Sequence, residues 1–443
     1  MSELHITGGR VLAGRAEVPP DKSILHRALM MAALGRGSSR IRPLGQGADN
    51  RSTAHVLEQL GVRVELGEDE ARVQGVGGPS HLKAPSGALD CGNSGTTMRL
   101  MAGICGAAPG LSVVLDGDAS LRSRPMGRLQ PLEAMGVQLQ AESTEPASPL
   151  RAPFRVTGGE LRGTAHSLSV ASAQLKSALL LAGAFAEGDT VVVEPRKSRD
   201  HTERMLAARG VRVRTELRAD GRHEASVQGP VEPWRNVDVE VPPDVSSAAF
   251  IIAAAAVTGG RIEVRTGVNP TRTGAFDVFR NMGVDVELGP EDDAAGEPIA
   301  VVRARRPGAL RPTEIAGELA LRSLDELPVL AGVALFAPGL TRIRDARELR
   351  VKESDRIDAV AAALSAFGGE VHTFEDGLDV VGGRPLRPAR VKAEGDHRIA
   401  MTGAIVGLGV EGTTVIEGAD VIGVSYPDFL YTLTQLGAEA RAG

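Results

Sequence analysis

The sequence predicts an α/β protein of two domains that together contain six copies of one small module. A helix end, a glycine turn and the start of an alternating strand recur six times, for example as LEQLGVRVE and LEAMGVQLQ. The turn glycines lie 69 to 85 residues apart, at Gly61, Gly136, Gly210, Gly283, Gly368 and Gly437. A chain of 443 residues also exceeds the usual size of one hydrophobic core. We therefore expect three modules in each domain.

A break in the repeat marks the expected domain boundary. Prolines and glycines interrupt the pattern between Pro230 and Val241. A Pro-Pro pair also isolates the first strand, His5 to Leu12, which is expected to pair with the C-terminal half. The predicted domains are residues 1–15 with 238–443, and residues 16–237. The acidic stretch Gly289 to Glu297 is expected to be a solvated hairpin or loop.

Composition excludes several classes of function. A formal net charge of −6 argues against a general nucleic-acid surface. The two cysteines, Cys91 and Cys105, lack metal-binding spacing and are expected to be reduced core thiols of a cytoplasmic protein. The chain shows no charged-then-apolar N-terminal signal, and the apolar run Ser247 to Val257 is too short to span a bilayer. We expect no nucleic-acid partner, no membrane partner and no metal.

Basic residues are distributed unevenly. Six are lysines and the other 44 are arginines, which suggests that lysine is kept where a compact ammonium is needed. Near the start of the helix before five of the turn glycines lies an arginine: Arg51, Arg124, Arg199, Arg272 and Arg356. A helix start favours anions over cations, so these arginines suggest a shared anionic ligand. Inherited repeat sequence is the alternative explanation.

The stretch Pro19 to Arg27 predicts a helix start that binds an anion. The prolines end a strand, and Asp21 or Ser23 can cap the next helix. Free N–H groups, a hydroxyl, the Lys22 ammonium and the Arg27 guanidinium would then surround one anion, most naturally phosphate. A capped surface helix with ordinary charges is the alternative.

Three further segments of the N-terminal half carry polar groups at helix starts. Asp90 to Arg99 reads DCGNSGTTMR, a backbone nest suited to an anion. Gly117 to Pro125 holds two closely spaced arginines that suit a carboxylate or phosphate clamp. In VASAQLKS, Ser172 and Gln174 can hold hydroxyl groups. Plain turns, surface charge and simple capping are the respective alternatives.

Candidate proton carriers lie in the C-terminal half. Asp325 precedes an apolar helix, where partial desolvation suits a general base. Glu353 lies in RVKESDR, which offers a cation, a proton carrier and an anion clamp together. His397, in DHR, is a third candidate. The sequence has no Walker pattern, dinucleotide fingerprint or defensible Ser-His-Asp arrangement.

Ten motifs in order carry a resemblance that spans nearly the whole chain. They are PPDKSILHR, GNSGTTMR, GDASLRSRPMGR, VASAQLKSALLLAG, SRDHTERML, NPTRTG, LDELPVLA, RVKESDR, DHRIAM and SYPDF. With them the chain resembles the 5-enolpyruvylshikimate-3-phosphate (EPSP) synthase family, and its Ser-Ala-Gln and Ser-Arg-Asp-His segments resemble the bacterial class II branch. The resemblance implies the two-domain enolpyruvyl transferase fold, with three βαβαββ units in each domain, closing on the substrates.

The resemblance also implies the reaction and its residues. Enolpyruvyl would pass from phosphoenolpyruvate to the 5-hydroxyl of shikimate 3-phosphate, with release of phosphate and without metal or cofactor, in the shikimate pathway. The implied ligands of shikimate 3-phosphate are Lys22, Ser23, Arg27, Ser172, Ala173, Gln174, Arg199, Asp325 and Lys352. Those of phosphoenolpyruvate are Lys22, Asn93, Gly95, Arg124, Gln174, Arg356 and Arg398.

The implied catalytic residues are Asp325, Glu353 and Lys22. Asp325 would accept the hydroxyl proton, and Lys22 or Glu353 would protonate the methylene carbon. The resemblance makes the chain a glyphosate target, but the response stays open, because Gly95 favours sensitivity and the class II likeness favours the opposite. A monomer is expected.

Three alternatives remain at this point. RNA 3′-phosphate cyclases, which share related modules, would need a nucleotide-accepting histidine site and a more basic face, and neither is visible in the sequence. A UDP-N-acetylglucosamine enolpyruvyl transferase would carry Lys-Asn in place of Lys22-Ser23, and a cysteine in the loop Gly117 to Arg124. A non-catalytic anion-binding relative would keep the arginines and lose Asp325 or Glu353, both of which are present.

Overall fold

The structure is a computed structural model that describes residues 3–45, 47–142 and 150–443. The chain divides into two compact units. Unit 1 comprises Met1–Pro19, Pro242–Asp293 and Pro298–Gly443, and unit 2 comprises Pro20–Val241 and Ala294–Glu297. The boundaries after residues 19 and 241 each lie four residues beyond those expected at 15 and 237.

The strands of the described residues form six sheets, three in each unit, and these sheets share one topology. In the sheet β6-β7-β9-β8, for example, β6 is parallel to β7, and β9 is antiparallel to both β7 and β8. The same order of a parallel pair followed by two antiparallel pairings recurs in every sheet. The sixfold repeat seen in the sequence is therefore a repeat of one α/β module.

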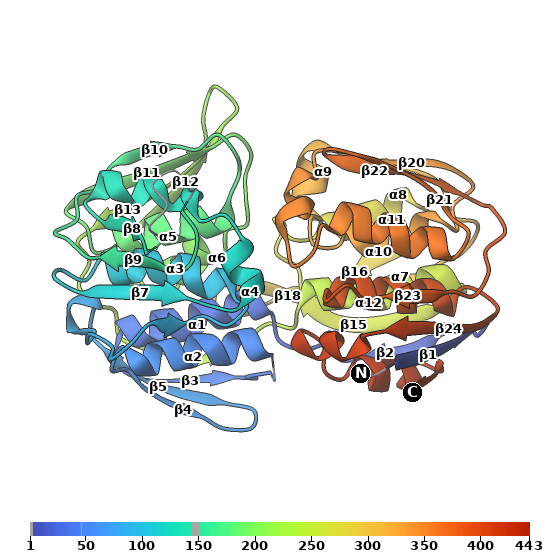
Figure 1. The fold of residues 1–443 in the computed structure, drawn as a ribbon, viewed down its shortest axis with the longest axis horizontal. Helices are drawn as coiled ribbons and strands as arrows, with labels where there is room; N and C mark the ends of the chain where they lie inside the picture. The colour runs from blue at the N-terminus through green and yellow to red at the C-terminus, as the bar shows by residue number, and fades with distance from the viewer. Residues whose placement is uncertain (1–2, 46, 143–149) are drawn as a thin grey trace. The chain divides into compact units, whose positions relative to one another are not determined.

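Unit 2 contains the sheets β14-β3-β5-β4, β6-β7-β9-β8 and β10-β11-β13-β12 (Figure 1). The strands are β3 Arg36–Arg42, β4 Arg63–Leu66, β5 Ala71–Val76, β6 Leu89–Asp90, β7 Ser112–Asp116, β8 Gln138–Ala141, β9 Phe154–Thr157, β10 Ala165–Ser167, β11 Gly188–Glu194, β12 Val213–Leu217, β13 His223–Gly229 and β14 Val239–Glu240. The helices are α1 Lys22–Leu34, α2 Ala48–Gln59, α3 Gly95–Gly106, α4 Ala119–Ser123, α5 Ala173–Gly183 and α6 His201–Ala207, with 3₁₀ turns at η1 Pro79–His81 and η2 Gly127–Met135.

Unit 1 contains the sheets β16-β18-β15-β2, β19-β20-β22-β21 and β23-β24-β1-β25. The strands are β1 Glu3–Gly8, β2 Ala13–Ala16, β15 Arg261–Gly267, β16 Asp285–Leu288, β17 Asp292–Ala294, β18 Glu297–Arg305, β19 Glu314–Ile315, β20 Gly339–Ile343, β21 Glu370–Phe374, β22 Gly377–Gly382, β23 Arg390–Lys392, β24 Gly412–Glu417 and β25 Glu439–Ala442. The helices are α7 Val245–Thr258, α8 Gly274–Asn281, α9 Gly317–Arg322, α10 Leu327–Ala334, α11 Arg356–Ala366, α12 His397–Leu408 and α13 Phe429–Gln435, with 3₁₀ turns at η3 Arg347–Val351 and η4 Ala419–Val424.

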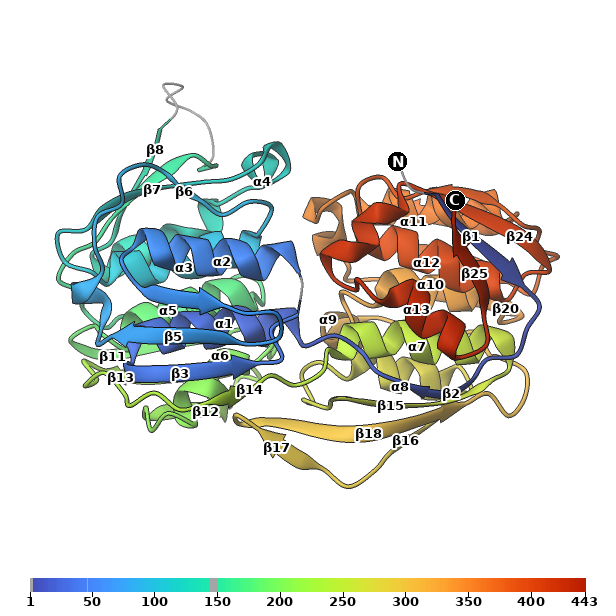
Figure 2. The same cartoon turned by 90° about the horizontal axis from the view of Figure 1, so that it is seen from below.

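Three strands complete a module to which they are not adjacent in sequence. β1 lies between β24 and β25 in the last sheet (Figure 2), which confirms the expected pairing of the first strand with the C-terminal half. β2 supplies the parallel edge beside β15, and β14 supplies the parallel edge beside β3. Each of these strands lies before one of the two points, after residues 19 and 241, at which the chain passes from one unit to the other, and each pairs within its own unit.

Each unit has its own core, because the helices of its three modules pack against one another as well as against the sheets. The buried side chains of unit 1 form one cluster and those of unit 2 another. α7 is buried on nearly every side, as its long run of alanine, isoleucine and valine predicts. No helix among the described residues is long and apolar enough to cross a membrane. Cys91 and Cys105 are buried free thiols, as expected.

The module turns depend on glycine, because all six turn glycines have positive φ, between 80° and 109°. The helix before the second of them differs from the expectation. Gly127–Met135 is a 3₁₀ segment, since Pro131 inside it has no N–H to donate to a regular α-helix. The stretch Gly289 to Glu297 forms the expected hairpin, since β17 pairs with β18, but Ala294 and Glu297 within it are buried instead of being solvated.

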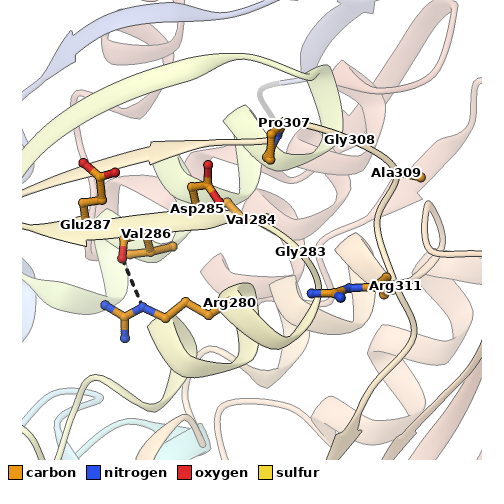
Figure 3. A pocket seen from close by; sticks show the side chains of 10 residues that line it. All are labelled: Arg280, Gly283, Val284, Asp285, Val286, Glu287, Pro307, Gly308, Ala309 and Arg311. Atoms are coloured by element: carbon orange, nitrogen blue, oxygen red, sulfur yellow. Dashed lines mark hydrogen bonds between the residues drawn. The ribbon is translucent and has the colours of Figure 1, made fainter.

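One cavity of unit 1 lies on α8, β16 and the loop after β18 (Figure 3). Its lining includes Arg280, Asp285, Glu287 and Arg311, and Arg280 Nε donates to the carbonyl oxygen of Val286 at 3.0 Å. None of the predicted site residues lines this cavity. Many of the predicted site residues instead lie at the starts of the helices that carry the motifs.

Candidate active site

The first turn of α1 carries the first candidate residues of unit 2. Asp21 caps the helix, because its Oδ1 accepts the N–H of Ile24 at 3.0 Å; of the two predicted caps, Asp21 and Ser23, the structure uses Asp21. Lys22 comes directly after the cap, and its Nζ lies 2.7 Å from Asp49 Oδ2 on α2. The predicted ammonium is thus held at the helix start by a carboxylate.

Arg27 lies one turn further along α1 and is buried. Its Nε donates to Thr202 Oγ1 and its Nη2 to Ser177 Oγ, both at 2.8 Å, and its Nη1 donates to the carbonyl oxygen of Ser23 at 2.9 Å. Burial lowers the pKa of Arg27 to about 10, so the guanidinium stays charged at neutral pH. Three of its five N–H donors make these bonds, which fix the group in place.

The GNSG segment brings three predicted ligands together at the start of α3. Arg124 donates to the side-chain and main-chain oxygens of Asn93, the latter at 3.3 Å. Gly95 is the first residue of α3, and a Cβ added there would lie 2.7 Å from Arg99 Nη1. The same Nη1 donates to Gln174 Oε1 at 2.7 Å. Arg99 therefore connects the starts of α3 and α5.

The start of α5 carries Ser172, Ala173 and Gln174. Ser172 caps the helix, and its own N–H donates to Glu194 Oε1 at 2.8 Å. Gln174 Nε2 donates to Thr96 Oγ1 of α3 at 3.0 Å. Arg199 is half-buried and lies just before α6. The predicted hydrogen-bonding residues thus occupy consecutive positions at one helix start.

Buried hydroxyl groups join three of these helices. His26 Nδ1 lies 2.6 Å from Thr53 Oγ1, which lies 2.7 Å from Thr97 Oγ1. Thr97 Oγ1 donates to Ser94 Oγ, the cap of α3, at 2.8 Å. Burial lowers the pKa of His26 to about 3, so its ring is neutral near pH 7. This series of hydrogen bonds connects α1, α2 and α3.

In unit 1 the candidate residues surround Arg356, which is 1 % exposed. Its Nε donates to Asp396 Oδ2 at 2.8 Å, its Nη2 to Glu353 Oε2 at 2.6 Å, and its Nη1 to Asp325 Oδ1 at 3.3 Å. Asp355 caps α11 and so places Arg356 at its first position. One guanidinium therefore orients two of the three predicted proton carriers of this unit. The third, His397, is the buried first residue of α12.

The charges of this cluster stabilise one another. Burial would lower the pKa of Arg356, but the carboxylates of Glu353, Asp396 and Asp325 outweigh it and raise that pKa above its usual value. Burial would likewise raise the pKa of Asp396, but the Arg356 guanidinium holds it below its usual range. All three carboxylates thus favour a permanently charged arginine.

Lys352 and Arg398 complete the cluster. Lys352 Nζ lies 3.6 Å from Asp325 Oδ1, and Arg398 Nη1 donates to the carbonyl oxygen of Asp325 at 2.8 Å. Arg398 lies two residues after the cap of α12, Asp396, which accepts its N–H at 2.9 Å. Asp325 is therefore a partly buried carboxylate held beside cations, a position from which it can accept a proton from a bound hydroxyl group.

The repeated arginines do not share one environment. Arg272 is buried, and its Nη2 donates to Ser246 Oγ at 2.7 Å. The same nitrogen lies 3.6 Å from Glu326 Oε1, so this arginine's charge is matched within unit 1. Arg51 is exposed on α2.

The structure gathers the predicted residues into one set in each unit. Unit 2 holds Lys22, Ser23, Arg27, Asn93, Gly95, Arg124, Ser172, Ala173, Gln174 and Arg199, and unit 1 holds Asp325, Lys352, Glu353, Arg356 and Arg398. Sequence reasoning assigned no role to Asp49, Arg99, Lys176 or Glu194. Two features of the sequence could have indicated a role for two of them. Lys176 is one of the few lysines, and Arg99 stands one helical turn after Gly95.

Within the described residues, no group of three or more histidine, cysteine, aspartate or glutamate side chains could hold a metal ion. The positive side chains and helix starts instead suit anionic ligands such as phosphates and carboxylates.

Comparison with known proteins agrees with this chemistry. Residues 6–433 match the family model described as EPSP synthase (3-phosphoshikimate 1-carboxyvinyltransferase). A 3-phosphoshikimate 1-carboxyvinyltransferase from Synechococcus sp. (strain JA-3-3Ab) is 46% identical over 437 residues, which are 98% of this chain and 96% of the relative. One of the same name from Anaeromyxobacter sp. (strain Fw109-5) is 47% identical over 429 residues, 96% of each chain.

Solved structures lead to the same family. EPSP synthase from Acinetobacter baumannii superposes with a TM-score of 0.86 at 37% identity, covering 100% of both chains. The enolpyruvyl transferase NikO from Streptomyces tendae has a TM-score of 0.76 at 20% identity, over 100% of this chain and 99% of its own, and shares the fold. The comparisons do not favour the UDP-N-acetylglucosamine alternative. With its sixfold module and its two sets of cationic helix starts, the chain belongs to the EPSP synthase (3-phosphoshikimate 1-carboxyvinyltransferase) family.

Proposed function

We propose that this protein transfers the enolpyruvyl group of phosphoenolpyruvate to the 5-hydroxyl of shikimate 3-phosphate and releases phosphate. Family membership over nearly the whole chain supports the reaction. The structural observation that carries it is the Asp325 carboxylate beside Lys352 and the buried Arg356. A partly buried carboxylate can accept a hydroxyl proton while the neighbouring cations hold anionic substrates nearby.

The ligands that we propose for the two substrates are the residues that the family resemblance implies. Shikimate 3-phosphate is bound by Lys22, Ser23, Arg27, Ser172, Ala173, Gln174, Arg199, Asp325 and Lys352. Phosphoenolpyruvate is bound by Lys22, Asn93, Gly95, Arg124, Gln174, Arg356 and Arg398. The support is chemical, because these groups are cations, hydrogen-bond donors and helix starts, which stabilise phosphate and carboxylate groups.

The reaction proceeds by addition and elimination. The 5-hydroxyl oxygen attacks C2 of phosphoenolpyruvate while Asp325 accepts the hydroxyl proton. The methylene carbon takes a proton from Lys22 or Glu353, which gives a tetrahedral adduct with a methyl group. The bond from C2 to the phosphate oxygen then breaks, the methyl group loses a proton, and the double bond forms again. Cations around the adduct stabilise the charge that develops on the leaving phosphate.

Phosphate release tests the proposal directly. The purified protein is incubated with phosphoenolpyruvate and shikimate 3-phosphate in the presence of a chelator, and free phosphate and the mass of the product are measured over time. Omission of either substrate is the control. We expect release only with both substrates. Binding of both without release would indicate a non-catalytic relative, and reaction only with UDP-N-acetylglucosamine would indicate the related transferase.

We further propose a cytoplasmic monomer that is a glyphosate target. Cys91 and Cys105 are buried free thiols, which are typical of a cytosolic protein. Burial also raises the pKa of Cys105 to about 12, so this thiol stays protonated at neutral pH. Light scattering on the purified protein tests the oligomeric state. Titration of phosphate release with glyphosate tests the target and measures the response that the sequence leaves open.

A further inference from the structure

Unit 2 contains a buried ion cluster that the proposed reaction does not use. Lys176 of α5 is 2% exposed, and its Nζ lies 2.9 Å from Glu194 Oε2 and 2.8 Å from Glu203 Oε1. Glu194 ends β11 and is 2% exposed, and Glu203 lies on α6 and is 4% exposed. Three elements thus meet at one fully buried ammonium.

This cluster contacts two segments that precede helices. Glu194 Oε1 accepts the main-chain N–H of Ser172, and both carboxylate oxygens accept from Ser198 Oγ, all at 2.8 Å. Lys176 Nζ donates to the carbonyl oxygen of Ser198 at 3.3 Å. Ser198 is therefore held at its side chain by Glu194 and at its main chain by Lys176.

Stability of the folded state alone does not explain why these charges are buried. Apolar side chains of similar volume often fill such a position at equal or greater stability. Burial would lower the pKa of Lys176, but the two carboxylates outweigh it and raise that pKa above its usual value. Lys176 therefore stays charged at neutral pH, and the cluster holds a specific geometry, which an apolar core would not provide.

We propose that Glu194, anchored by Lys176, is a positioning residue for the phosphate of shikimate 3-phosphate. The inference rests on the proposed function, in which Ser172 and Arg199 bind that substrate. Glu194 fixes the main chain of Ser172 directly and the main chain before Arg199 through Ser198. Ligand groups that are already in place do not have to be ordered when the phosphate arrives.

A pair of matched variants separates positioning from packing. Glu194→Gln removes the charge that holds Ser172 and Ser198. Glu203→Gln removes an equally buried carboxylate with the same Lys176 partner, and no hydrogen bond of Glu203 among the described residues reaches Ser172 or Ser198. KM for each substrate, kcat and the thermal midpoint are measured for both variants and for the unmodified protein. Calorimetric titration with shikimate 3-phosphate measures its affinity directly.

Glu194→Gln should raise KM and Kd for shikimate 3-phosphate about tenfold and leave KM for phosphoenolpyruvate nearly unchanged. Glu203→Gln should lower the thermal midpoint similarly without weakening the binding of shikimate 3-phosphate, because Ser172 and Ser198 keep their hydrogen bonds to Glu194. The inference would be overturned if both variants weakened the binding of shikimate 3-phosphate equally, or if neither variant weakened it. Absence of turnover in the unmodified protein would instead overturn the proposed function.

Glu194→Asp covers the case in which Glu194→Gln does not fold. It keeps the charge beside Lys176 but shortens the side chain by one methylene group, so its oxygens withdraw from Ser172. A folded Glu194→Asp protein should show the same selective rise in KM for shikimate 3-phosphate. Unchanged KM in this variant would contradict the positioning role.

Discussion

Lys22 Nζ and Asp49 Oδ2 lie 2.7 Å apart, so the ammonium that we propose touches both substrates already holds a carboxylate of its own unit. The pair joins the first residue of α1 to α2, and the Lys22 side chain is 30% exposed while that of Asp49 is 12% exposed. Asp49 therefore fixes an ammonium that can still reach a ligand.

Replacing Asp49 with Asn should lower kcat/KM for both substrates. The amide keeps one acceptor oxygen for Lys22 but loses the charge, and we expect a loss of about tenfold from a less well oriented ammonium. Steady-state assays of phosphate release measure it. Glu58→Gln, on the exposed face of the same helix, is the control and should behave like the unmodified protein. Unchanged kcat/KM in Asp49→Asn would mean that Lys22 needs no such partner.

Asp325→Asn should retain substrate binding and lose turnover. Its amide oxygen cannot accept the hydroxyl proton, and loss of a general base costs roughly 10² to 10⁴ in rate. Calorimetric titration with shikimate 3-phosphate and phosphate-release kinetics separate the two effects. Glu318→Gln changes an exposed carboxylate of α9 and should leave kcat intact. A kcat near normal in Asp325→Asn would remove Asp325 as the base.

Arg356→Lys should be harmful to both stability and activity. A single ammonium cannot reproduce the three donors that meet Asp325, Glu353 and Asp396, and an uncompensated buried carboxylate costs ~3–5 kcal/mol of unfolding free energy. Urea unfolding measures this loss, and KM for phosphoenolpyruvate should rise as well. Arg347→Lys alters an exposed ion pair with Glu375 and should change stability by less than about 1 kcal/mol. Equal effects of the two variants would contradict the central role of Arg356.

Gly95→Ala should weaken the binding of phosphoenolpyruvate. The new Cβ would lie 2.7 Å from Arg99 Nη1, so Arg99 must move and its bond to Gln174 is strained. Both Gly95 and Gln174 are proposed ligands of phosphoenolpyruvate, and its KM should therefore rise about five- to tenfold. Gly87→Ala meets no atom within 4 Å and is the control. An unaltered KM would show that Arg99 relaxes without cost.

His26 should make the protein less stable in mild acid. Burial lowers the pKa of its folded ring from 6.5 to about 3, so the unfolded state binds a proton first as the pH falls. The contribution is complete above pH 6.5 and declines below it, by about 2 kcal/mol at pH 5. Urea unfolding from pH 7 to pH 5 measures the slope. His26→Gln should flatten that slope, and His55→Gln, an exposed ring on α2, should not. Parallel slopes in His26→Gln and the unmodified protein would exclude this assignment.

Local sequence signals predicted much of the fold, because caps and turns act over a few residues. Asp21, the six turn glycines and the cap of α12 each follow from short-range chemistry. The pairing of the first strand was also predictable, since Pro19 and Pro20 separate it from the helix that begins at Lys22. The 3₁₀ form of Gly127–Met135 was missed, although Pro131 signals it.

Long-range polar pairing was not predictable from the sequence. Lys176, Glu194 and Glu203 look like ordinary surface charges, and only the packing of α5, α6 and β11 brings them together. Glu297 is a similar case, because its acidic loop looked solvated, yet its Oε1 lies 2.7 Å from His201 Nδ1 in unit 2. The motifs identified candidate ligands, and the structure adds the residues that hold them in place.

The position of β1 between β24 and β25 has a consequence for the order in which the protein can mature on the ribosome. Residues 20–241 emerge as a nearly complete unit and can acquire much of their structure early. The N-terminal strand must wait for partners more than 400 residues later, at Gly412–Glu417 and Glu439–Ala442. Until synthesis reaches them, its pairing edges remain open and available to wrong partners. Pulse-labelled chains should therefore acquire protease resistance first in residues 20–241.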